Sequence, residues 1–205
     1  MSKKLADSIA GVLVEQSHTQ HSEAVLSYGL QIMINSILKI SVITFAGWAL
    51  HLLPEMYVMI LSFGILRMIT GGVHAHTFVR CLSISSISFI LLSLLVSPTL
   101  PYFFTHTSAI LFAFIMIGLL TTWVYVPGSW GNRKFSARRI QQSKILSLSI
   151  LLIVCTAVGS YLPSTSYPNL LWAAILGMTW QYILVTPPGY AFYRVIERTV
   201  ATGRG

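Results

Sequence analysis

The chemistry with the clearest support in the sequence belongs to one cysteine and one histidine. His74 and Cys81 lie seven residues apart, shortly after Gly71 and Gly72. A cysteine attacks as its thiolate, and histidine is the side chain best suited to take the thiol proton near neutral pH. The pair therefore predicts nucleophilic catalysis, with Cys81 as the nucleophile and His74 as the general base.

The chain must bend between these two residues if they are to meet. On an unbroken helix, seven residues separate two side chains by about 10 Å, which is beyond hydrogen-bond reach. Gly71 and Gly72 end a helix readily and allow close approach of the backbone. We therefore expect a turn that opens into a helix near Cys81, where the helix N-terminus would favour the thiolate.

Other interpretations of these residues remain open. His76 is an alternative base, or it could join His74 and Cys81 in a zinc site. A structural zinc ion requires four ligands, and the sequence offers no CxxC pair and no nearby carboxylate, so we expect neither a metal nor another cofactor. The segment could also be a polar loop with an incidental thiol. Cys155, in an apolar run, is expected to be a small core residue.

The elements that position this segment must lie in lipid. Of the 205 residues, 55% are hydrophobic and 9% charged, with a mean hydropathy of +0.74, whereas a soluble domain carries roughly a quarter charged residues. This composition excludes a water-soluble globule and predicts one integral all-α membrane domain. The net charge of +8 would suggest nucleic acid for a soluble protein, but basic residues also gather on the cytoplasmic flanks of membrane helices, so no nucleic-acid partner is expected.

Six apolar stretches are long enough, or nearly so, to cross the roughly 30 Å of hydrocarbon in a bilayer. An amphipathic segment is expected before them at 1–24, a basic cytoplasmic connector at 127–144, and a cytoplasmic tail at 187–205. The second and third stretches are short enough to be partial or re-entrant. The six are 25–50, 56–70, 82–97, 102–126, 145–162 and 169–186.

The distribution of lysine and arginine predicts the orientation. Basic residues precede the first stretch, lie between the second and third and between the fourth and fifth, and follow the sixth. The connectors around Pro54, from Pro98 to Pro101 and from Pro163 to Pro168 contain none. By the positive-inside rule, both termini and the His74–Cys81 segment lie on the cytoplasmic side.

Polar residues within the apolar stretches must face protein or water. Gln31, Asn35 and Lys39 recur every four residues along one helix face. They either form interhelical hydrogen bonds or line a hydrophilic cavity, in which Gln31 and Asn35 would contact a substrate. Arg67 either extends to the membrane surface or holds a substrate carbonyl or carboxylate beside the reactive segment.

The basic connector also has two interpretations. Its positive charge sets the topology and contacts lipid headgroups, or it captures an acidic peptide. Five basic residues make it up: Arg133, Lys134, Arg138, Arg139 and Lys144.

The reactive segment resembles that of a known family. The sequence GGVHA at 71–75, with Arg67 seven residues before His74 and Cys81 seven after it, is similar to the accessory gene regulator protein B (AgrB) family of membrane peptidases. The chain length, the multispan pattern, the amphipathic start and the YVP at 125–127 also fall where that family has them. The basic run is less compact than the family's lysine cluster, which bears on peptide specificity more than on catalysis.

The resemblance implies a cysteine endopeptidase of the bacterial cell membrane. Such an enzyme cleaves an AgrD-like propeptide at its C-terminal side and promotes cyclisation to a thiolactone or lactone autoinducing peptide for quorum sensing. Cys81 would be the nucleophile, His74 the base and Arg67 the family's upstream arginine. The implied partners are the propeptide, membrane lipids and a second copy of the chain in a homodimer.

An alternative function is a small multispan transporter of peptides or solutes. In that case Gln31, Asn35, Lys39 and Arg67 would line a pathway, and the thiol of Cys81 would be incidental.

Overall fold

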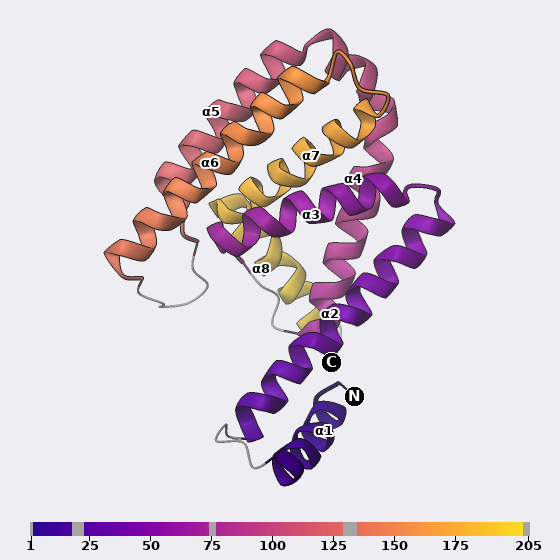
Figure 1. The fold of residues 1–205 in the computed structure, drawn as a ribbon, viewed down its shortest axis with the longest axis vertical. Helices are drawn as coiled ribbons and strands as arrows, with labels where there is room; N and C mark the ends of the chain where they lie inside the picture. Colours follow the sequence, from indigo (N-terminus) through magenta and orange to yellow (C-terminus); the bar gives the residue numbers. More distant parts are fainter. Residues whose placement is uncertain (1, 18–22, 74–76, 129–134, 203–205) are drawn as a thin grey trace. The chain divides into compact units, whose positions relative to one another are not determined.

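The computed structural model describes residues 2–17, 23–73, 77–128 and 135–202, except for the side chains of 2–5, 14–17, 23 and 197–202. The described chain folds into α-helices and contains no strand (Figure 1). The helices are α1 (Ser2–Ser17), α2 (Glu23–Ala49), α3 (Leu53–Thr70), α4 (Phe78–Thr105), α5 (Thr107–Tyr125), α6 (Ala137–Tyr161), α7 (Pro168–Val185) and α8 (Pro187–Thr202).

The prediction of an all-α membrane protein is confirmed. Helices α2 to α6 are each long and apolar enough to cross a membrane, and α7 meets the same test together with the first part of α8. The axes of α7 and α8 differ by 81°, so this pair is either a broken span or a re-entrant element. The six expected apolar stretches correspond to α2 through α7.

The expected connector from Pro98 to Pro101 is wrong, because both prolines lie inside α4. Tertiary packing explains why the helix continues to Thr105. Phe103 is buried and stacks on Trp172 of α7 at 4.6 Å between ring centroids, and the Trp172 indole N–H donates to Thr99 Oγ1 at 2.7 Å. The chain reverses instead at His106.

The basic connector is also shorter than predicted. The Ser136 hydroxyl caps α6 by accepting from the Arg139 backbone N–H at 3.4 Å, so Arg138, Arg139 and Lys144 are helical residues. Likewise, the segment expected to be a tail begins with the helix α8.

The described residues group into two compact units, 1–49 and 50–205, and each is described by itself. In the first unit α1 packs against α2, and the Ser27 hydroxyl donates to the Asp7 carboxylate. Gln31, Asn35 and Lys39 lie half-buried on α2 of this unit.

In the second unit α7 is the central helix and contacts α3, α4, α5 and α8. Its closest approach is to α3, at Gly177. A Cβ atom at that position would collide with the Met59 carbonyl oxygen and would lie 2.6 Å from Ser62 Oγ. Cys155 of α6 is buried in the core cluster around Met178 and Tyr182, which confirms its predicted packing role.

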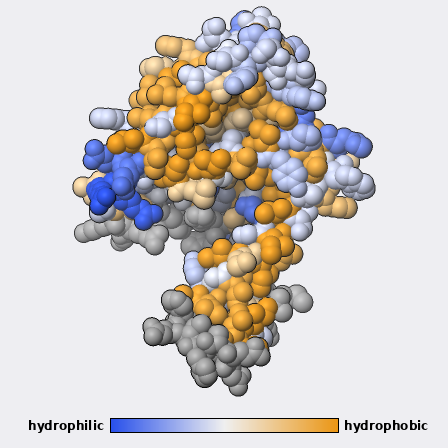
Figure 2. All heavy atoms as spheres, viewed as in Figure 1, coloured by the Kyte–Doolittle hydropathy of each residue, from blue (hydrophilic) through white to orange (hydrophobic). Residues whose placement is uncertain are grey.

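The surface of the helices is apolar where lipid would contact it. Figure 2 shows hydrophobic residues over much of the visible face. Phe112, Leu120, Trp123 and Ile153 are among the large exposed side chains of α5 and α6. Continuous apolar exposure of this kind is unfavourable in water and is expected for a chain surrounded by lipid.

The α3–α7 contact predicts different outcomes for two Gly→Ala substitutions. Gly177→Ala is expected to lower the free energy of unfolding by about 1–3 kcal/mol, because the backbone of α3 must move to admit a methyl group. Gly159→Ala on α6 is the control, since its Cβ would meet nothing within 4 Å. Unfolding of the purified protein in detergent measures both, and equal stability of the two variants would contradict close packing at Gly177.

Candidate active site

The site is built around the connector that joins α3 to α4. Helix α3 ends at Thr70 because Gly71 and Gly72 have φ angles of 69° and 125°, which favour glycine over any other residue. The Gly71 N–H still donates to the Arg67 carbonyl at 2.9 Å and closes the last turn. The predicted helix break at the two glycines is therefore confirmed.

The two glycines lie directly against the segment that follows α5. The Gly128 N–H donates to the Thr70 carbonyl at 2.7 Å, and the Gly72 N–H donates to the Gly128 carbonyl at 3.3 Å. A Cβ atom at Gly71 would lie 2.5 Å from the Gly128 oxygen. The YVP segment at 125–127 thus leads into a glycine that holds the connector, a contact that the sequence analysis missed.

A buried glutamine of α7 binds the same connector. Gln181 has no exposed surface, and its Nε2 donates to Thr70 Oγ1 at 2.7 Å and to the Gly71 carbonyl at 2.8 Å. Its Oε1 accepts from Arg67 Nη1 at 3.2 Å. All three hydrogen-bond partners of this amide lie on α3 or just after it, so the amide fixes the connector to the central helix. Its signal in the sequence is an amide within an otherwise apolar run.

Arg67 completes this network from α3. Its Nη2 donates to the carbonyl of Val73, the residue immediately before His74, and its guanidinium lies 5.7 Å from the centre of the Phe63 ring. Arg67 also interacts electrostatically with Cys81 and with Tyr193 of α8. The hydrogen-bond partners described for this arginine are therefore Gln181 of α7 and the Val73 carbonyl of the connector.

Cys81 lies in the first turn of α4, as the sequence predicts. Thr77 caps this helix by accepting from the Arg80 N–H at 3.4 Å, and the Cys81 N–H donates to the Thr77 carbonyl at 3.0 Å. The thiol is free and half-buried. The Ser85 hydroxyl donates to the Cys81 carbonyl one turn before it.

A small hydrophobic cluster fixes both ends of the connector. Val73, Ile84, Leu184 and Tyr193 are buried together, and they come from the connector, α4, α7 and α8. His74 and His76, the two candidate bases, lie outside the described residues. Among the residues that the structure does describe, no group of three or more His, Cys, Asp or Glu side chains could hold a metal ion.

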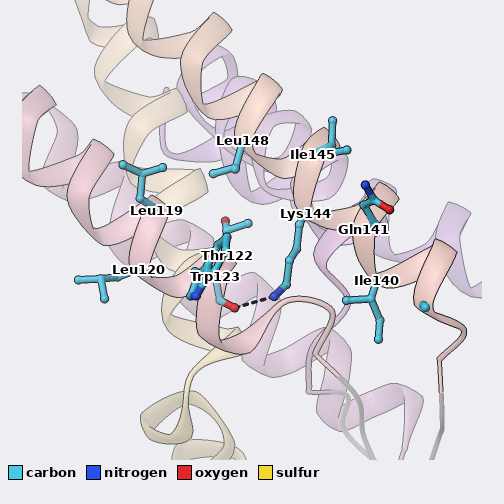
Figure 3. Close-up of a pocket in the computed structure, with 10 residues that line it drawn as sticks. Leu119, Leu120, Thr122, Trp123, Ile140, Gln141, Lys144, Ile145 and Leu148 are labelled. Atoms are coloured by element: carbon cyan, nitrogen blue, oxygen red, sulfur yellow. Dashed lines mark hydrogen bonds between the residues drawn. The ribbon is translucent and has the colours of Figure 1, made fainter.

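The basic residues of the expected connector differ in their surroundings. Arg138 and Arg139 are exposed on the first turn of α6, and Arg139 lies over the Phe135 ring at 5.6 Å. Lys144 Nζ donates to the Trp123 carbonyl at 2.7 Å across a cleft of about 680 Å³ between α5 and α6 (Figure 3). Arg133 and Lys134 lie outside the described residues.

Gln31 and Asn35 belong to the first unit, whereas Cys81, Arg67 and Gln181 belong to the second. A contribution of α2 to the site is therefore still a hypothesis from the sequence.

Comparison with known proteins gives one match. The model of a protein family described as accessory gene regulator B matches residues 3–185, which include the whole reactive segment. No curated protein and no solved structure matches the chain.

The buried amide network predicts the effect of Gln181→Leu. The substitution keeps the volume but leaves the Gly71 carbonyl and Arg67 Nη1 without these partners, so the free energy of unfolding is expected to fall by about 1–3 kcal/mol. Gln141→Leu, at an exposed position of α6, is the matched control and should change stability little. If denaturant unfolding gives the same stability for both variants, the network does not hold the connector.

Proposed function

The chain belongs to the accessory gene regulator B family, and from that premise we propose that it is a membrane-embedded cysteine endopeptidase that cleaves an AgrD-like propeptide. Family membership supports a role in the processing of a quorum-sensing peptide. The observation that carries the enzymatic proposal is the position of Cys81, a free thiol at the start of α4 beside a connector held by Arg67 and Gln181.

In the proposed first step, His74 removes the proton from Cys81 and the thiolate attacks the carbonyl carbon at the processing site. The C–N bond then breaks, and the proton passes from the imidazolium to the leaving amine. The C-terminal fragment departs, and the N-terminal part stays on Sγ as a thioester. The position of Cys81 in the first turn of α4, directly after the connector that carries His74, supports this proposal.

The thioester has two fates. Water could hydrolyse it, or a thiol or hydroxyl within the bound peptide could attack it and form a ring. Exchange of one thioester for another is nearly isoenergetic, so a thiolactone needs no ATP. A site that excludes water favours ring closure over hydrolysis.

The oxyanion of the tetrahedral intermediate also needs donors. Backbone N–H groups at the start of α4 are candidates within the same unit, and Gln31 and Asn35 of α2 are candidates in the other. Arg67 serves in this proposal mainly to position the connector through Val73, with direct contact to a substrate carbonyl as its second role.

The exposed Arg138 and Arg139, with Arg133 and Lys134 before them, are proposed to capture the acidic C-terminal part of the propeptide. Lys144 differs from them because its ammonium already binds the end of α5.

Cys81→Ala is expected to abolish cleavage while the protein still folds. The substrate for this test is a propeptide with an internal Cys or Ser and an acidic tail, as a short reading frame beside the gene is expected to encode. Mass spectrometry should detect a peptide thioester on the wild-type protein and none on the variant. Cys155→Ala, which alters the other thiol within the core, is the control and should keep cleaving. Cleavage by Cys81→Ala would refute Cys81 as the nucleophile, whereas transport of the peptide without cleavage by either protein would favour the transporter hypothesis.

Electrostatic capture predicts a change in KM. Replacing Arg133, Lys134, Arg138 and Arg139 together by Gln should raise KM for an acidic-tailed peptide several-fold and leave kcat unchanged, because binding is lost equally in the ground and transition states. The rise should shrink at high salt, which screens exposed charges. The same peptide with a neutral tail is the control. Capture is refuted if the variant and the wild type have the same KM for both peptides.

A further inference from the structure

An apolar groove lies beside the helix that carries Cys81. Its volume is about 490 Å³, and three helices line it: α4 with Ile84, Ile87, Ser88 and Leu91, α7 with Trp180, and α8 with Phe192. Among the described residues, no charged side chain lines this groove. Its polar groups are serine hydroxyls and the indole N–H of Trp180, so it suits apolar rather than ionised ligand groups.

One edge of the groove follows the face of α4 on which Cys81 lies. Ile84, Ser88 and Leu92 follow Cys81 by three, seven and eleven residues, and these spacings return to one face of a helix. With a rise of 1.5 Å per residue, the groove begins about 5 Å along the axis from Cys81 and ends about 16 Å from it. An extended peptide advances roughly 3.3 Å per residue, so the groove has the length of about three to four residues.

One wall of the groove is part of the site itself. Ile84 is buried with Val73, the residue that precedes His74, and Trp180 and Ile196 pack against the same cluster. The groove is therefore continuous with the connector that Arg67 and Gln181 hold.

The bend between α7 and α8 supplies the third wall. Gly189 makes this bend possible, since a Cβ atom there would lie 2.5 Å from the Ile183 carbonyl oxygen. The close return of α8 places Phe192 across from α4.

We infer that this groove binds the residues on the acyl side of the scissile bond and selects large apolar side chains there. The inference rests on the proposed attack by Cys81. After that attack the acyl part stays joined to Sγ, so its side chains must lie beside Cys81 until the thioester is resolved. Apolar side chains in the groove would also displace water from the thioester and so favour ring closure.

Peptidyl chloromethyl ketones test this inference without the natural substrate. Cys81 Sγ forms a bond to the methylene carbon of such a probe and chloride leaves, so the peptide of the probe occupies the acyl side. Acetyl-Ala-Ala-Phe and acetyl-Ala-Ala-Gln chloromethyl ketones are compared on the full-length protein in lipid nanodiscs, with alkylation of Cys81 followed by mass spectrometry. The Phe probe is expected to react about tenfold faster, as burial of one aromatic ring implies.

Two matched serine variants distinguish binding in the groove from a general effect of hydrophobicity on the alkylation rate. Ser88→Phe fills the groove and should bring the Phe-to-Gln rate ratio close to one, with the rate of alkylation by iodoacetamide unchanged. Ser97→Phe, exposed on the same helix and outside the groove, should keep the wild-type ratio. Ile87→Ser removes part of an exposed wall with less risk to folding and should lower the ratio several-fold.

Each outcome has a distinct meaning. A wild-type ratio near one, or a ratio that Ser88→Phe and Ile87→Ser leave unchanged, overturns the inference, because the groove then holds lipid tails or the probe merely partitions into the bilayer. Failure of Cys81 to react with any probe, together with cleavage by Cys81→Ala, overturns the proposed function and this inference with it.

Discussion

A helix that breaks inside an apolar environment leaves backbone carbonyls that something else must satisfy, and each unpaired group costs several kcal/mol in hydrocarbon. After α3 ends, the Thr70 carbonyl accepts from Gly128, the Gly71 carbonyl from Gln181, and the Val73 carbonyl from Arg67. The donors come from the segment after α5, from α7 and from α3 itself. The break therefore gathers two distant parts of the chain, together with α3 itself, around the residues that precede His74 and Cys81.

This arrangement explains why α7 is both the core of the unit and part of the site. Gly177 brings α7 close to α3. One turn later, Gln181 binds the connector, and Leu184 joins the cluster that holds Val73. The helix then ends in the bend to α8, which closes both that cluster and the groove beside Cys81. Packing and chemistry thus depend on successive positions of one helix.

The sequence allowed the prediction of features that arise from local pattern. Apolar runs predicted the spanning helices, and the two glycines predicted the helix break before Cys81. The continuation of α4 through Pro98 and Pro101 could not be predicted from the sequence, because the contact of Phe103 with Trp172 joins residues far apart in the chain. The roles of Gln181 and Gly128 were missed for the same reason, since no sequence pattern indicates which residue a single amide or glycine contacts. The bond of Arg67 to Val73 was not predicted either, because it depends on a turn whose path the spacing alone does not define.

The contact of Gly71 and Gly72 with Gly128 joins two connectors that the proposal uses for different purposes. One leads to Cys81, and the other leads through 129–136 to the exposed arginines of α6. Because backbone hydrogen bonds join Gly72 and Thr70 to Gly128, a backbone shift on either side of this contact is passed to the start of the other connector. Under the proposed function, the part of the enzyme that attacks the propeptide and the part that leads to its basic residues therefore share one main-chain junction.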